Sequence, residues 1–333
     1  MPKVSVIVPV YGAERYIERC ARSLFEQTLE DIEYIFINDA TRDKSIEILT
    51  SISHEYPSRR HQINIVNLER NQGVANARMV GMKTATGDYV IHCDPDDWVD
   101  KKLYESMYHV AVGKMADIVV CNFIHITSQG NIFKDECSQI KSSNPLDLIK
   151  TTSKPFWGSL WNKLIKRSLY VDNNVFPYPG INYTEDLGVS YRLFFYAKSI
   201  ASATSACYYY NGINETSACH QNNLVNWESM EKIINNLSRF LKERGQQKYE
   251  LAICFLKFSQ KTVLLYNDDL IDKWRRTYPE SHKYIMSYSH YSLNERRLFW
   301  LVTKSKMFYY AHHYFSCIVS SLQRYQSGKK YVI

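Results

Sequence analysis

Val4-Ser5-Val6-Ile7-Val8 is the stretch of the chain that decides its fold, and Pro9 ends it. Four of these five residues are apolar and β-branched, whereas a strand with one face in water would alternate apolar and polar residues. A continuous apolar run of this kind is typical of a strand that is buried on both faces of a parallel sheet. The sequence therefore predicts that the chain begins with a fully buried parallel strand.

The residues up to about position 93 alternate between helical and strand patterns. The expected bounds are 14–25, 44–53 and 74–84 for helices, and 32–37, 63–66 and 89–93 for strands. This βαβαβαβ order predicts an α/β fold with an open, mostly parallel sheet and right-handed crossovers. Later strands are expected at 118–123 and 208–210, with a hairpin turn at 129–131.

Length and composition are those of an ordered protein with two parts. The chain has 333 residues, is 45% hydrophobic and contains few glycines and prolines (12 and 9), so it is long enough to bury a large core. From Leu224 onward the periodicity is helical. We therefore expect a sheet domain over residues 1–220 and a helical C-terminal region over residues 221–333.

Cysteine usage and the N-terminal pattern indicate a cytoplasmic protein. The eight cysteines show no CxxC pair and no metal-ligand spacing with histidine, so we expect free buried thiols rather than disulfides or a zinc site. The apolar run that ends at Val10 is too short for a signal peptide. No run of 18 apolar residues, as a membrane span would need, occurs in the sequence.

Positive charge is concentrated near the C-terminus. The whole chain carries +7, and residues 291–333 contain seven lysines and arginines against one glutamate, a local excess of +6. Over residues 298–325 the basic residues are interleaved with Trp, Phe and Tyr, which suits a helix lying at the inner surface of the cytoplasmic membrane. The alternative is a helical cap with a solvated charged face. No nucleic-acid-binding motif accompanies the charge, so nucleic acid is not expected as a partner.

Acidic and amide side chains gather where the expected strands end, which is where open parallel sheets bind ligands. Asp94-Pro95-Asp96-Asp97 places three carboxylates within four residues directly after a buried strand. A divalent cation would relieve their mutual repulsion, because Mg²⁺ and Mn²⁺ prefer hard oxygen ligands. The alternative is a cluster that caps a helix N-terminus.

Three further strand ends carry candidate ligand groups. Asp39 can accept a hydrogen bond from a nucleobase imide, and Glu14 can bond a base or ribose, although each is also an ordinary cap or turn residue. Asn71, in the turn Asn71-Gln72-Gly73, and Arg78 would place an amide and a guanidinium near a diphosphate. A salt bridge is the alternative for Arg78.

Taken in order, four motifs resemble those of the family 2 glycosyltransferases, which have the GT-A fold. The resemblance covers about the first hundred residues. The motifs are Val6-Ile7-Val8-Pro9-Val10-Tyr11, Asn38-Asp39-Ala40-Thr41-Arg42-Asp43, Asn71-Gln72-Gly73 with Ala77-Arg78, and Gly87-Asp88-Tyr89 leading to Asp94-Pro95-Asp96-Asp97. We therefore expect a Rossmann-like GT-A catalytic domain followed by the helical region.

The resemblance implies a role for each motif. Asp94 would face the ribose, and Asp96 would hold the Mg²⁺ or Mn²⁺ that bridges the donor diphosphate, while Arg78 would lie near the same pocket. Gly12, Ala40 and Met79 depart from the residues that the family usually has at these positions. These departures remove no carboxylate, but they concern the preference for the nucleobase. The residues implied around the nucleoside, usually a uridine, are Pro9, Tyr11, Glu14 and Asp39.

A second acidic element, Glu185-Asp186, resembles the family's Glu-Asp pair. The resemblance implies that Asp186 takes the proton from the acceptor hydroxyl, and a carboxylate base fits a displacement at the anomeric carbon. Glu185 would orient this base or contact the acceptor. The alternative is a pair of residues that cap the helix expected over 187–196.

The stretch before this pair resembles the corresponding stretch of bacterial members of the family. It contains Trp157, Trp161 and Lys163, and the two indole rings would form a stacking wall for an acceptor sugar, with core packing as the alternative. Asn214, together with Ser217 and His220, is a candidate for a loop that closes over the diphosphate.

The sequence thus predicts an inverting glycosyltransferase that moves a sugar from a nucleotide-sugar donor, expected to be UDP-linked, to a saccharide or lipid-linked saccharide acceptor. Bacterial surface polysaccharide assembly is the expected setting. A sugar nucleotidyltransferase is a second reading, but residues 10–14 lack the Gly-rich basic loop that it predicts. A third reading is a non-catalytic sugar- or membrane-binding module that keeps the fold.

Overall fold

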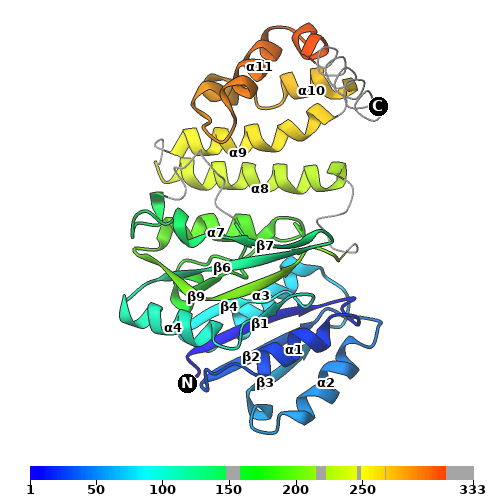
Figure 1. Cartoon of the computed structure of the whole chain (residues 1–333), viewed down its shortest axis with the longest axis vertical. Helices are drawn as coiled ribbons and strands as arrows, with labels where there is room; N and C mark the ends of the chain where they lie inside the picture. The colour runs from blue at the N-terminus through cyan, green and yellow to red at the C-terminus, as the bar shows by residue number, and fades with distance from the viewer. Residues whose placement is uncertain (148–157, 215–222, 246–248, 267, 313–333) are drawn as a thin grey trace, which may run out of the picture. The chain divides into compact units, whose positions relative to one another are not determined.

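The computed structural model describes residues 1–147, 158–214, 223–245, 249–266 and 268–312, and Figure 1 shows their elements. Trp157, Ser217, His220 and residues 313–325 of the expected membrane segment lie outside these ranges. The chain divides into two compact units, the first ending at Phe240 and the second beginning at Leu241. The predicted boundary at residue 220, between a catalytic region and a helical C-terminal region, stays a prediction.

A nine-stranded sheet in the order β3-β2-β1-β4-β8-β6-β9-β5, with β7 beside β6, organises the first unit. Strands β1 to β4 are parallel, whereas β8 runs antiparallel to both β4 and β6. The strand bounds are β1 Val4–Val10, β2 Ile32–Asn38, β3 Ile63–Asn67, β4 Tyr89–His92, β5 Trp98–Val99, β6 Ile118–Thr127, β7 Gly130–Lys134, β8 Lys163–Lys166 and β9 Ile200–Asn211.

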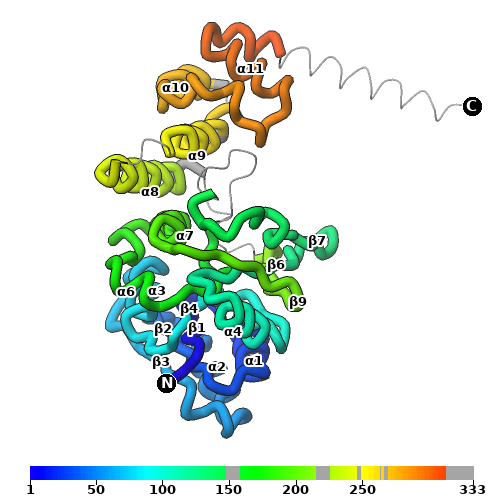
Figure 2. Tube along the Cα trace, turned by 90° about the vertical axis from the view of Figure 1, so that its left-hand side faces the viewer, coloured from blue at the N-terminus to red at the C-terminus, as the bar shows by residue number. Residues whose placement is uncertain are grey.

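Helices cover both faces of the parallel strands, as the apolar β1 sequence predicts (Figure 2). Alternate β1 residues, such as Val6 and Val8, share one core with α1, α2 and α4. On the other face Gly81 of α3 lies so close to Ile7 that an added Cβ would be 2.3 Å from its Cγ2. The helices of the first unit are α1 Ile17–Phe25, α2 Ser45–Glu55, α3 Val74–Thr84, α4 Leu103–Gly113, α6 Arg167–Asp172 and α7 Glu185–Tyr196. Helix α8, Asn223–Glu243, begins in the first unit and ends within the first residues of the second.

The predicted α/β fold class with a C-terminal helical region is confirmed. The expected helix at 74–84 has the bounds of α3, and the expected hairpin turn at 129–131 joins β6 to β7. The strand expected at 208–210 is much longer, because β9 pairs with β6 from Ile200 to Asn211 across a bulge near Cys121. The six cysteines in the described ranges are free thiols.

The second unit is helical and is built around an aromatic core. The Phe258 ring of α9 lies 5.3 Å from Phe299 and 5.9 Å from Trp274, measured between ring centroids. Its elements are α9 Glu250–Thr262, α10 Ile271–Arg276, a 3-10 segment Pro279–Ser287 and α11 Leu293–Lys304. None of the helices in the described part of the chain has the length and apolar character that crossing a membrane requires.

Candidate functional site

The acidic run Asp94 to Asp97 forms a tight turn at the carboxyl end of β4. The Asp97 N–H donates to the Asp94 carbonyl at 3.1 Å, and β5 begins at the next residue. Because a strand and not a helix follows, the cluster does not cap a helix N-terminus. Its carboxylates therefore need another explanation.

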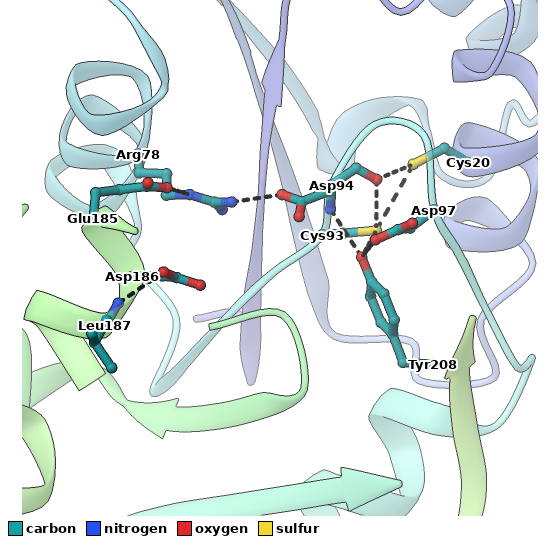
Figure 3. A network of polar contacts seen from close by, with 9 residues as sticks. All are labelled: Cys20, Arg78, Cys93, Asp94, Asp97, Glu185, Asp186, Leu187 and Tyr208. Atoms are coloured by element: carbon teal, nitrogen blue, oxygen red, sulfur yellow. Dashed lines mark hydrogen bonds and ion pairs between the residues drawn. The ribbon is translucent and has the colours of Figure 1, made fainter. Parts of the chain in front are cut away.

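Asp97 has a structural role, because it links this turn to β9. Its side chain is buried, and its two oxygens accept hydrogen bonds from the Tyr208 hydroxyl at 2.6 Å and the Asn211 N–H at 2.7 Å. The Tyr208 hydroxyl also accepts from the Asp94 N–H at 3.0 Å (Figure 3). Tyr208 thus ties the turn to β9 at two points.

Arg78 joins the acidic turn to the second acidic element. Its Nη2 donates to Asp94 Oδ1 at 2.6 Å and its Nε donates to Glu185 Oε1 at 3.0 Å, so one guanidinium lies between β4 and α7 (Figure 3). Arg78 and Glu185 are buried, and the Asp94 side chain is 25% exposed. Burial by itself would lower the pKa of Arg78. The two carboxylates outweigh this effect and raise the pKa above its usual value, so the guanidinium stays charged.

Glu185 and Asp186 begin α7 beneath Arg78. Burial raises the pKa of Glu185 to about 7, while the charge of Arg78 acts in the opposite direction. Burial also raises the pKa of Asp186, and Arg78 again opposes the shift. The Asp186 side chain accepts a hydrogen bond from the Leu187 N–H at 2.8 Å. Raised carboxyl pKa values are a feature of groups that exchange protons in catalysis.

Asp96 lies partly exposed in the turn, and Asn214 contacts its side chain. Asn214 Nδ2 donates to Asp96 Oδ2 at 2.7 Å, and the Tyr16 hydroxyl donates to Asn214 Oδ1 at 3.3 Å. Burial and the nearby Asp94 raise the pKa of Asp96, whereas Asn214 and Arg19 act in the opposite direction. A bound cation would further favour the ionised form of Asp96.

The residues of the acidic turn fit a metal ion whose coordination shell is completed by the phosphates of a bound ligand. Among the described residues no group of three or more His, Cys, Asp and Glu side chains could hold a metal alone. Mg²⁺ and Mn²⁺ are commonly held by one or two carboxylates, with substrate phosphates filling the remaining positions. Asp96, a partly exposed carboxylate in the turn, is a suitable protein ligand of that kind.

The predicted nucleoside residues lie at the ends of β1 and β2, but their side chains differ in availability. Asp39 is buried and accepts from the N–H groups of Gln72 at 2.7 Å and Gly73 at 2.8 Å. A carboxylate offers about four acceptor positions, so Asp39 has positions left to accept a hydrogen bond from a nucleobase. Tyr11 is 56% exposed, as a ring that stacks on a base requires.

Glu14, Asn71 and Pro9 complete this end of the site. The Glu14 carboxylate is exposed and accepts from the Lys44 N–H at 3.1 Å, next to the start of α2. Asn71 is exposed in the loop that leads to α3, and Pro9 is buried within β1. Their contacts with a nucleoside stay predictions.

The predicted acceptor residues inside the described ranges are buried. Trp161 is 4% exposed, and its ring stacks on Tyr208 and Tyr210 with centroid distances of 4.5 and 5.6 Å. Lys163 has no exposed surface, and its ammonium donates to the Ser159 carbonyl at 2.6 Å. These positions match the core-packing alternative for Trp161, and a direct acceptor contact by either residue stays a prediction.

Sequence reasoning missed Tyr208 and Asn182 as members of the site. Asn182 Oδ1 accepts from the Ala75 N–H at 3.2 Å, and Gly73 has φ 85° with Asn182 directly against it. This contact fastens the loop before α7 to the start of α3. One indication of the position of Tyr208 was present in the sequence. Alternate residues of a strand share a face, so Tyr208 and Tyr210 were expected on the same face of their strand. The strand that pairs with it was not predictable.

The Tyr208→Phe variant is expected to lower the free energy of unfolding by about 1–3 kcal/mol, because it removes one of the two hydrogen bonds of the buried Asp97 carboxylate and the hydrogen bond of the Asp94 N–H. Chemical denaturation measures this change. Tyr209→Phe is the matched control, since its hydroxyl bonds Asp100 at 3.0 Å in a partly buried position. Equal stability of the two variants would contradict the part given to Tyr208.

Residues 5–172 match the protein family described as glycosyl transferase family 2. EpsH of Bacillus subtilis, which is named as a glycosyltransferase, is 29% identical over 265 residues, covering 78% of this chain and 71% of EpsH. The poly(ribitol-phosphate) beta-glucosyltransferase of Bacillus spizizenii is 30% identical over 213 residues, or 62% of this chain and 32% of that protein.

The fold is also found among solved structures. The structure of S. aureus TarS 1-349 in complex with UDP has a TM-score of 0.62 and 19% sequence identity, covering 92% of this chain and 91% of that one. At this identity the likeness concerns the fold. It supports the GT-A architecture that the four motifs imply.

Proposed function

Because the chain belongs to glycosyl transferase family 2 and is a glycosyltransferase, we propose that it transfers a sugar with inversion from a nucleotide-sugar donor to a saccharide or lipid-linked saccharide. One observation carries this proposal. The buried Arg78 contacts Asp94 at 2.6 Å and Glu185 at 3.0 Å, which brings the residues expected at the donor and those expected at the acceptor into one site.

The donor side of the proposal assigns the nucleoside to the ends of β1 and β2 and the diphosphate to the turn after β4. Tyr11, Glu14 and Asp39 would contact the nucleoside, with Asp94 near the ribose. A UDP-linked donor is supported by the UDP complex of the TarS structure, which shares the fold, and by the motif resemblance. Arg78 and Asn71 would contribute near the phosphates.

Asp96 is proposed as the protein ligand of a Mg²⁺ or Mn²⁺ ion. When bound, the ion would stabilise the negative charge that develops on the leaving nucleoside diphosphate. Asn214 would hold the Asp96 carboxylate in place through its 2.7 Å hydrogen bond. Asp97 is not assigned this role, because its side chain is buried and its two oxygens are directed at the Tyr208 hydroxyl and the Asn211 N–H of β9.

Asp186 is proposed as the general base. A hydroxyl that attacks the anomeric carbon must lose its proton as the bond forms, and a carboxylate at the start of α7 can accept it. Arg78 opposes the effect of burial and favours the ionised form of Asp186 that this step needs. Glu185, held by Arg78, would orient the pair.

Metal-stimulated hydrolysis of a panel of nucleotide sugars tests the proposed activity. We expect one or a few donors, UDP-linked sugars first, to be hydrolysed faster with Mn²⁺ than with a chelator. Absence of hydrolysis and of binding for every nucleoside diphosphate sugar would contradict it and favour a non-catalytic module. Formation of a nucleotide sugar from sugar phosphate and UTP would indicate a nucleotidyltransferase instead.

Bacterial polysaccharide synthesis at the cytoplasmic membrane is the proposed setting. The relative from Bacillus spizizenii acts, by its name, on a polymer of ribitol phosphate. In the second unit, exposed apolar side chains accompany basic residues near the end of the described chain. They are Trp300 at 46%, Met307 at 67%, Phe308 at 44% and Tyr310 at 37% exposure, beside Arg297, Lys304 and Lys306.

These residues form a surface suited to anionic lipid. The inner side of α11 packs through Phe299 and Val302, so Trp300 and Arg297 lie on its outer side. Lys304 lies over the Trp300 ring at 5.3 Å. Aromatic rings partition into the headgroup region while basic side chains attract anionic headgroups, and both contributions favour peripheral binding.

The double variant Trp300→Ala with Phe308→Ala is expected to bind vesicles of phosphatidylglycerol and phosphatidylcholine about tenfold more weakly, because it removes apolar area that would enter the headgroup region. Vesicle sedimentation measures the partition coefficient. Phe133→Ala is the matched control, since Phe133 is 57% exposed in the first unit. Equal binding by the double variant, or no binding by the unaltered protein, would remove the membrane from the proposal.

A further inference from the structure

Lys163 is a buried lysine that the proposed reaction does not use. It begins β8, has no exposed surface, and donates from Nζ to the Ser159 carbonyl at 2.6 Å and to Asn162 Oδ1 at 2.7 Å. The Ser159 hydroxyl donates to the same Asn162 oxygen at 2.9 Å. Burying an ammonium is costly unless hydrogen bonds and opposite charges compensate it. The arrangement therefore calls for a compensating carboxylate nearby.

The segment from Gly158 to Asn162, which holds this ammonium, is packed directly on the beginning of α7. An added Cβ at Gly158 would lie 2.8 Å from the Leu187 Cα, so the two backbones are in close approach. The Ser190 hydroxyl donates to the Gly158 carbonyl at 2.5 Å. The segment thus contacts the first two turns of α7, where Glu185 and Asp186 lie.

Strand alternation places Lys163 on the same side of the sheet as these carboxylates. Leu164 belongs to the core shared with α1, α2 and α4, so Lys163 and Ile165 point to the opposite face. That face carries α3, with Arg78, and it is also the face of Ile7. Lys163 and Arg78 therefore approach the Glu185-Asp186 pair from two different elements, β8 and α3.

We propose that Lys163 is a positioning residue, which, docked on α7 through residues 158–162, holds Asp186 as the carboxylate that accepts the acceptor's proton. This inference rests on the proposed function, and it gives Lys163 a part that needs no contact with the acceptor sugar. The ammonium acts through its charge on Asp186, and the segment acts through its contact with the α7 backbone.

The charges around Lys163 and Asp186 agree with the proposed role of Lys163. Asp186 faces Arg78 from α3, Lys163 from β8, Asp94 from the turn after β4 and Glu185 from its own helix. The two cations lower the pKa of Asp186, whereas burial and Asp94 raise it. Around Lys163 lie Glu136, Asp186 and Cys121, and burial lowers the pKa of Lys163 to about 8. The Lys163 ammonium is therefore mostly charged below about pH 8.

The direction of the expected effect follows from the sign of this charge. Removing a cation near a carboxylate raises the pKa of that carboxylate, so the base becomes protonated at a higher pH. In Lys163→Met the acid limb of the pH profile of kcat should move upward by about one pH unit. A loss of folded protein alone would lower the amplitude of the profile without moving its midpoint.

Asn162→Asp is a second variant that changes almost no volume. Asn162 Oδ1 already accepts from Lys163, while its buried Nδ2 has no hydrogen-bond partner. An aspartate there would keep the contact and neutralise the ammonium, so the acid limb should move in the same direction. This variant decides the question if Lys163→Met does not fold. Lys261→Met is the matched control, since Lys261 is an equally buried lysine of the second unit and should leave the midpoint unchanged.

The experiment measures kcat and the acceptor KM across pH for the full chain and these variants, with Asp186→Asn alongside. An upward shift of the acid limb in Lys163→Met and Asn162→Asp supports the proposal. An unshifted midpoint, or a raised acceptor KM with an unshifted midpoint, would overturn it while leaving the base in place. Full activity of Asp186→Asn would instead refute the proposed base, which separates the two failures.

Discussion

The Asp186→Asn variant is expected to transfer sugar about 10²- to 10⁴-fold more slowly, with unchanged affinity for the donor, because general base catalysis contributes rate factors of this size. The amide has nearly the same shape but cannot accept the proton of the attacking hydroxyl. Asp186 lies at the start of α7, and its pKa is raised by burial and lowered by Arg78. Initial transfer rates and calorimetric titration with the donor measure the two quantities.

Asp172→Asn serves as the control for this variant, since Asp172 is an exposed carboxylate at the end of α6. It should behave like the unaltered protein. Transfer by Asp186→Asn at a normal rate would show that another group removes the proton. Loss of donor affinity in the same variant would show that Asp186 acts at the donor, and the division of the site into two sides would then be wrong.

The Asp96→Ala variant is expected to lose metal-dependent use of the donor by about 100-fold or more, because a metal stabilises transition-state charge by several kcal/mol and each 1.4 kcal/mol is a factor of ten. Steady-state rates at increasing Mn²⁺ concentration measure the effect. Asp96 is a partly exposed carboxylate of the turn, and Asn214 Nδ2 donates to its Oδ2 at 2.7 Å.

Asp172→Ala is the corresponding control, and it should keep the Mn²⁺ response of the unaltered protein. An Asp96→Ala protein that responds to Mn²⁺ normally would place the ion elsewhere. Asp97→Ala is a less informative change, because Asp97 bonds Tyr208 and Asn211 and its loss would disturb β9 as well.

The first half of the sheet was predictable because its signals are local. Each strand from β1 to β4 is a short, largely apolar run that is followed by polar residues, and a sheet brings such ends together. Gly73, with φ 85°, and the helix Val74–Thr84 lie where the turn and helix patterns indicated. The candidate residues near the donor therefore follow from the order of the elements.

The long-range contacts of the site were not predictable from local patterns. Arg78 had two readings, a phosphate contact and a salt bridge, and its contacts with Asp94 and Glu185 join residues that are 16 and 107 positions away. Tyr208 meets Asp97 across 111 positions. Such pairs depend on strand order, and β8 and β9 enter the sheet in an order that their own sequences do not reveal.

Burial also separated alternatives that residue type left open. A tryptophan near a sugar site can stack on substrate or fill a core, and Trp161 packs between rings of β9 and β6 at 4% exposure. An acidic run can cap a helix or bind a cation, and β5 after Asp97 excludes the cap. These distinctions depend on the three-dimensional surroundings of each side chain.

Calorimetric titration of the full chain with UDP, in the presence of Mn²⁺ and then with a chelator, tests the central claim most directly. The account predicts that UDP binds, that Mn²⁺ strengthens the binding, and that Asp96→Ala removes the strengthening. Absence of binding by UDP and by every other nucleoside diphosphate, with Mn²⁺ present, would contradict a donor site built around the turn from Asp94 to Asp97.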